Sequence, residues 1–108
     1  MEFPQKDSKA SLIKVNLYEF IGTFFLTLTV NVSQGKHFNI GFMYFMLILV
    51  AKDVSGAHFN PAISLAIYLF EGRWISNLKW LLSYNMMQYA GAFLGCYYSH
   101  YLVPNPEE

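Results

Sequence analysis

A short apolar segment that begins at Asn60 constrains the fold more than any other part of the sequence. Asn60 is a good helix N-cap, because its side-chain oxygen can accept a backbone N–H of the first turn. Pro61 suits the first helical position, since it has no N–H to leave unpaired and its φ is already helical. Residues 62–70 continue as an apolar run, which Glu71 and Gly72 end. At ~1.5 Å per residue this helix is roughly 15 Å long, about half of a bilayer's hydrocarbon core.

A helix of that length cannot cross a membrane, but it can enter halfway and return where neighbouring protein shields its irregular backbone. The composition favours a membrane setting, because 55% of the residues are hydrophobic and only 13% are charged, against about 25% charged residues in soluble domains. We therefore predict an all-α membrane protein. A capped surface helix of a soluble protein is the alternative interpretation of the segment taken alone. The net charge of zero gives no reason to expect a nucleic-acid partner.

Three longer apolar segments are predicted to cross the membrane: residues 15–32, residues 38–54, and a third segment at about 78–103 that begins between Trp74 and Leu81. The first is near the lower length limit for a crossing helix. The second has neither charge nor polar–apolar alternation over most of its length, so a buried helix of a soluble protein would look similar. The three segments and the short helix form one domain, residues 15–103.

The distribution of basic residues predicts the orientation. Six lie before the first segment or between the second and third: Lys6, Lys9, Lys14, Lys52, Arg73 and Lys79. Lys36 alone lies between the first and second segments. Because basic residues collect on the cytoplasmic side of a membrane, we predict a multi-pass integral membrane protein with a cytoplasmic N-terminus. Residues 1–14 are expected to be a polar, mobile cytoplasmic tail, and residues 104–108 a second polar tail.

Residues 55–62, Ser-Gly-Ala-His-Phe-Asn-Pro-Ala, resemble the first signature loop of the aquaporin (major intrinsic protein) family, and we call them the signature loop. That family has six membrane-spanning helices in two inverted repeats, each with a half-helix that starts at Asn-Pro-Ala. This sequence holds one such motif. The resemblance therefore implies one aquaporin-like repeat, the N-terminal one, with three transmembrane helices and a re-entrant half-helix.

The resemblance also implies a pore wall, to which we assign Asn60, Pro61, Ala62, Gly56, Ala57, His58 and Ile40. A water pore needs weak donors and acceptors and a field that repels cations. The N-terminus of the half-helix would supply roughly +0.5 of a charge. The Asn60 amide N–H₂ group would be free to donate to water if its oxygen caps the helix. Residues 56–58 would run extended and present their carbonyl groups to the lumen.

Two of these residues have a plainer interpretation. Ile40 falls where the family's second helix contributes to the outer selectivity filter, but ordinary packing explains it equally well. His58 is expected to position the backbone, because no acidic or cysteine partner lies at metal-ligand spacing nearby. We expect no metal and no cofactor.

Four residues are assigned to structural support. Glu19 belongs to a Glu-Phe-x-Gly-Thr pattern in the first segment, and the resemblance implies that its carboxylate holds the signature loop. An interfacial glutamate near the end of the segment is the alternative. Gln88, followed by Gly91 and Ala92, resembles the family's third-helix pattern. Gly91 and Gly95 form a Gly-x-x-x-Gly pair, which lets another helix approach closely in lipid.

The predicted function is half of an aquaporin-type channel for passive passage of water or small neutral solutes. Conduction would need a complementary second half, and we expect the chain to be a piece of a longer protein. Pairing with a separately encoded second half is an alternative, and pairing with an inverted copy of the same chain is disfavoured by the distribution of basic residues. The alternative is a non-conducting membrane subunit that associates with full-length aquaporin-type channels through Gly91 and Gly95. Lys52 and Asp53 depart from the family's small or uncharged residues, so the inner vestibule is expected to differ. An enzyme is not expected, since the sequence shows no recognisable pair of a nucleophile and a base.

Overall fold

The computed structural model describes residues 1–4 and 11–103. Within these residues the chain forms four α-helices and no strand: α1 (Leu12–Val32), α2 (His37–Ala51), α3 (Pro61–Glu71) and α4 (Trp74–Leu102). The all-α prediction is confirmed. The predicted tail at 104–108 lies outside the described residues, as do Lys6 and Lys9 of the predicted N-terminal tail.

The helix ends differ from the predicted ones where a local signal was overlooked. α1 begins at Leu12 because the Ser11 hydroxyl caps it, accepting the Lys14 N–H at 3.4 Å. α2 ends at Ala51, three residues before the predicted end, because the chain turns there and the Val54 and Ser55 N–H groups both donate to the Ala51 carbonyl. This turn directs the signature loop back into the helical bundle.

α3 matches its predicted limits to within one residue. Gly72 follows it in the left-handed conformation, with φ of 71°, which is the usual way to end a helix with glycine. α4 then begins at Trp74, so the connection between α3 and α4 is only two residues long. The Tyr68 hydroxyl donates to the Trp74 carbonyl at 2.6 Å and fixes the corner.

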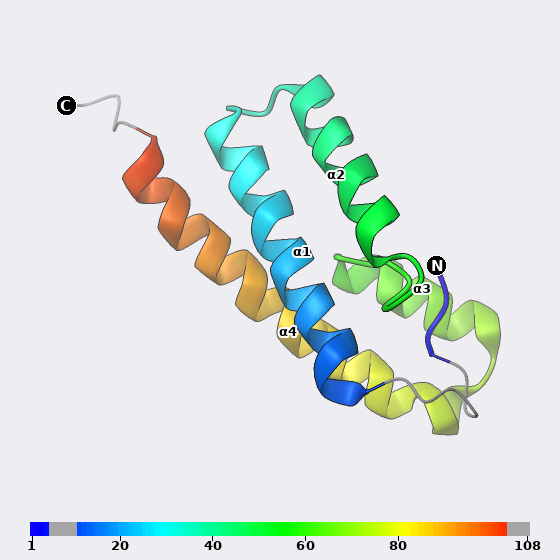
Figure 1. Ribbon diagram of the computed structural model, residues 1–108. Helices are drawn as coiled ribbons and strands as arrows, with labels where there is room; N and C mark the ends of the chain where they lie inside the picture. The colour runs from blue at the N-terminus through cyan, green and yellow to red at the C-terminus, as the bar shows by residue number, and fades with distance from the viewer. Residues whose placement is uncertain (5–10, 104–108) are drawn as a thin grey trace.

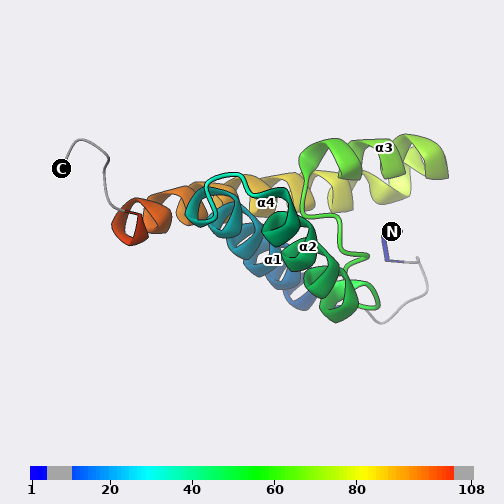
Figure 2. The same cartoon turned by 90° about the horizontal axis from the view of Figure 1, so that it is seen from above.

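α1 is the central element of the bundle. α1 and α2 form an antiparallel hairpin, α4 runs along another side of α1, and α3 lies against the first half of α4 (Figure 1). Seen from above, α2 and α3 lie apart, and the signature loop runs from the end of α2 to the start of α3 (Figure 2). The molecule is elongated, with principal extents of 53 × 22 × 22 Å.

One face of α4 is buried, and its residues recur every three or four positions: Asn77, Trp80, Leu81, Tyr84, Gln88, Gly91, Gly95 and Ser99. Asn85 and Ala92 are half-buried at the edge of this face. The opposite face is exposed, with Met86 at 68% and Phe93 at 78% exposure.

The described residues contain one helix, α1, that is both long and apolar enough to cross a membrane. α2 has 15 residues, which at ~1.5 Å each gives about 22 Å, shorter than a bilayer core of about 30 Å. α4 has 29 residues and is long enough, but its first half carries Asn77, Lys79 and Asn85. The multi-pass arrangement stays a prediction.

Candidate functional site at the signature loop

The tip of α3 carries the Asn-Pro start that the sequence predicts. The Asn60 side-chain oxygen accepts the Ala62 N–H at 2.8 Å, and Pro61 occupies the first turn. Because the amide oxygen is used as the cap, the Asn60 N–H₂ group projects away from its own helix. Asn60 and Ala62 are exposed and Pro61 is half-buried.

The Glu19 carboxylate holds the loop directly before α3. Its two oxygens accept the backbone N–H groups of His58 at 3.0 Å and Phe59 at 2.8 Å, and the Gln88 amide at 3.0 Å. Glu19 is completely buried. A buried carboxylate is costly unless hydrogen bonds satisfy it, and here donors from the loop and from α4 do so. Glu19 therefore ties α1, the loop and α4 together.

Gln88 extends this network to α3. Its amide also donates to the Ser64 hydroxyl at 2.9 Å, and Ser64 lies 2.9 Å from Nδ1 of His58. Since Ser64 accepts from Gln88, its own proton can go to Nδ1, which leaves the ring proton on Nε2.

The backbone of the signature loop is not extended, which corrects our expectation for residues 56–58. Gly56, Ala57 and Phe59 have φ of 83°, 57° and 56°. A left-handed conformation costs a non-glycine residue roughly 1–2 kcal/mol, and it persists where the surroundings fix it. Here the contacts with Glu19 fix residues 58 and 59, and the Ser55 hydroxyl accepts the Ala57 N–H at 3.2 Å.

Two tyrosine hydroxyls donate hydrogen bonds to backbone carbonyl groups of the loop. Tyr84 donates to the Ser55 carbonyl at 2.6 Å and Tyr44 to the His58 carbonyl at 3.4 Å. These two carbonyls therefore already have partners inside the chain. The row of free acceptors that we expected is thus interrupted at His58.

Glycines on α1 and α4 allow the elements around the loop to come close. A Cβ atom at Gly22 would overlap the Phe59 ring, so the glycine of the Glu-Phe-x-Gly-Thr pattern leaves room for the loop. Cβ atoms at Gly91 and Gly95 would press on the backbone carbonyl oxygens of Phe20 and Phe24. The helix that approaches this Gly-x-x-x-Gly pair is therefore α1 of the same chain.

The predicted pore-lining residues do not all share one environment. Asn60 and Ala62 face outward at the tip of α3, whereas Gly56, Ala57 and His58 are buried behind it. Ile40 is half-buried near the start of α2, toward the opposite end of that helix from the loop. The structure brings Glu19 and Gln88 together at the loop.

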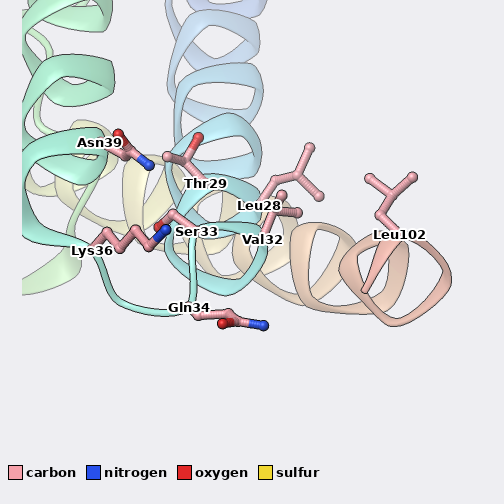
Figure 3. A pocket seen from close by; sticks show the side chains of 8 residues that line it. All are labelled: Leu28, Thr29, Val32, Ser33, Gln34, Lys36, Asn39 and Leu102. Atoms are coloured by element: carbon pink, nitrogen blue, oxygen red, sulfur yellow. The ribbon is translucent and has the colours of Figure 1, made fainter. Parts of the chain in front are cut away.

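A shallow pocket of about 490 Å³ lies at the other end of the bundle, where α1 turns into α2 (Figure 3). Thr29, Ser33, Lys36 and Asn39 gather on one side of it, and Leu28, Val32 and Leu102 lie on the other. It contains none of the predicted site residues. Across residues 1–4 and 11–103, no group of three or more His, Cys, Asp or Glu side chains could hold a metal ion.

Four residues of the site were missed at the level of sequence: Phe3, Ser55, Ser64 and Tyr84. Ser55 lies in the signature loop and Ser64 in the helix that follows it. The sequence around a serine does not show which group its hydroxyl will bond, so neither partner could be predicted. Phe3 is 1% exposed and packs on the loop, so the first residues are not the free polar tail that we predicted. Its aromatic character in a polar segment was the available signal.

These features define a class of protein: a helical protein with a short helix capped by Asn60, whose preceding loop is held inside the bundle by a buried carboxylate. Residues 7–107 match the family profile of the major intrinsic proteins. The chain belongs to this family, whose members are channels for water or small solutes and not enzymes.

Several curated relatives support the assignment. Human Aquaporin-9 is 42% identical over 103 residues, which cover 81% of this chain and 33% of the relative. An Aquaglyceroporin of Toxoplasma gondii is 40% identical over 65 residues, covering 60% and 24%. The Glycerol uptake facilitator protein of Buchnera aphidicola is 33% identical over 99 residues, covering 80% and 37%. The chain thus spans about a third of the length of these relatives. No solved structure matches it significantly.

Proposed function

We propose that this chain forms the N-terminal half of an aquaporin-type channel and passes water or small neutral solutes once a second repeat completes the pore. The observation that carries the proposal is the tip of α3. A capped helix of 11 residues, too short to span a bilayer, begins at a loop that Glu19 fixes from inside the bundle. In a membrane, a re-entrant helix of this kind would place its N-terminus at a defined depth.

The chemistry of the tip suits weak binding of water. The helix dipole places roughly +0.5 of a charge at the N-terminus, which disfavours cations and protons. The N–H₂ group of Asn60 can donate to a water oxygen, because its oxygen is held by the Ala62 N–H. Pro61 adds no N–H that would hold water too strongly. The tip thus offers the Asn60 amide as a hydrogen-bond donor near the positive end of the helix dipole.

The need for a second half is supported by surfaces that remain uncovered. On α3, Leu65, Leu69 and Phe70 are 47%, 59% and 90% exposed. Asn60 and Ala62 at the start of the helix are exposed as well. A polar group left unpaired in lipid costs several kcal/mol. A second repeat packed against α3 would bury the apolar side chains and shield the Asn60 amide from lipid.

The proposed orientation is a cytoplasmic N-terminus. Among the described residues, Lys14 lies in the first turn of α1, Lys52 follows α2, and Arg73 and Lys79 lie at the start of α4, whereas Lys36 lies between α1 and α2. This bias supports an arrangement with the signature loop and the end of α3 toward the cytoplasm. The alternative of a non-conducting subunit loses its proposed contact, because α1 already covers Gly91 and Gly95.

Reconstitution in lipid vesicles tests the proposal. The chain is combined with the second repeat of a relative such as human Aquaporin-9, and water and glycerol fluxes are followed by light scattering after an osmotic step. We expect faster volume change than in empty vesicles for the pair, and no increase for either half alone. If both halves are folded and associated and the flux equals that of empty vesicles, the proposal is wrong.

A further inference from the structure

The N-terminal residues form a second support for the signature loop, besides Glu19. Phe3 is 1% exposed and meets the His58 ring edge-on, with ring centroids 4.9 Å apart. It also lies 5.0 Å from the Tyr84 ring, and His58 and Tyr84 are themselves 5.0 Å apart. The three rings thus make a closed cluster that joins the N-terminus, the loop and α4.

Backbone contacts fix Phe3 in this cluster. Its N–H donates to the Glu71 carboxylate at 3.2 Å, and the same carboxylate accepts the Asn77 amide at 2.6 Å. The backbone of Glu2 lies so close to Gly56 that a Cβ atom there would overlap it. Met1–Pro4 therefore touches the loop, the end of α3 and the start of α4 at once.

The position of His58 links this cluster to the tip of α3. The backbone N–H of His58 is bound by Glu19, and its ring contacts Ser64 of α3. The Phe3 ring packs edge-on against the His58 ring. Removing the phenyl ring would free His58 to rotate and would let water reach the hydrogen bonds behind it, while the contact between α1 and α4 would remain.

We propose that Phe3 is a positioning residue for the pore loop, acting through His58 and anchored by Glu71. The inference deepens the proposed function, because this loop is the one assigned to the pore. It assigns the first residues of the chain to the channel machinery and not to a free tail. Its test does not depend on conduction.

Hydrogen exchange of the full chain in lipid nanodiscs tests it at single amides. In Phe3→Ala, we expect the amides of Ala57, His58 and Phe59 to exchange about tenfold faster or more. The variant loses two aromatic contacts, and each of them shifts the local opening equilibrium of the loop several-fold. Amides of the α1–α4 contact near Gly91 should keep their rates. Phe3→Leu retains apolar volume without a ring and should give an intermediate increase.

The matched control is Phe70→Ala, because Phe70 is a phenylalanine with 90% exposure on α3. It should leave all these rates unchanged. Unchanged exchange at His58 and Phe59 in Phe3→Ala would overturn the inference. So would an equal increase throughout α1 and α4, because Phe3 would then be an ordinary core residue. Neither outcome bears on water flux, so this inference can fail while the proposed channel function stands.

Discussion

Replacing Glu19 with alanine should destabilise the chain by about 3–5 kcal/mol. The change leaves three buried donors without an acceptor, namely the N–H groups of His58 and Phe59 and the Gln88 amide. Each buried donor left unsatisfied costs about 1–3 kcal/mol, and water entering the gap recovers part of that loss. The measurement is the free energy of unfolding from titration of detergent micelles with a denaturing detergent, followed by helical circular dichroism.

Glu19→Gln separates the hydrogen bonds from the simple loss of volume. The glutamine oxygen can take the place of Oε2 and keep the bonds from Phe59 and Gln88, but its N–H₂ group then faces the His58 N–H. We expect a smaller loss of about 1–3 kcal/mol. Thr29→Val is the control, because its hydroxyl bonds only to the Phe25 carbonyl within α1. Equal stability of Glu19→Ala and the control would contradict the role of Glu19.

Alanine at Gly91 should destabilise the chain, although alanine normally favours helices. The new Cβ would press on the backbone carbonyl of Phe20, which cannot move without separating α1 from α4. Overpacking of this kind costs about 1–3 kcal/mol, more than the ~1 kcal/mol gained in helix propensity. Gly95→Ala meets the Phe24 carbonyl oxygen at 2.7 Å and should behave similarly.

Gly41→Ala is the matched control on α2, since nothing lies within 4 Å of the Cβ position there. It should be neutral or stabilise by up to about 1 kcal/mol. The same detergent titration, applied to all three variants, compares them directly. A stabilising Gly91→Ala would mean that α1 and α4 do not approach as closely as the structure has them.

Local features of the chain could be predicted from sequence, and long-range ones could not. The limits of α3 follow from Asn60, Pro61 and Gly72, because caps act over one turn. The positive φ of Ala57 could not be foreseen, since the Glu19 carboxylate and the Ser55 hydroxyl impose the loop conformation.

Residues that support the loop also depend on long-range contacts, and these were harder to predict. The role of Glu19 at the loop was expected from family resemblance and not from periodicity. Its hydrogen bond with Gln88 was not predicted, because the two residues are 69 positions apart. Phe3 was missed because its site is built from residues near 56, 71 and 84. An aromatic residue in a polar segment indicates burial, but it does not show which residues bury it. The orientation of the bundle remains a prediction from charge.

The depth of the α3 tip in a bilayer tests the central claim most directly. Nitroxide labels at Ala62→Cys and Phe70→Cys, each in a Cys96→Ser background, are compared in lipid vesicles by their collision rates with oxygen and a water-soluble nickel chelate. We predict that the label at 62 lies near the bilayer centre, about 15 Å from the edge of the hydrocarbon core, and that the label at 70 lies nearer the surface. A label at 62 as accessible to the chelate as one at Lys36→Cys would contradict the account.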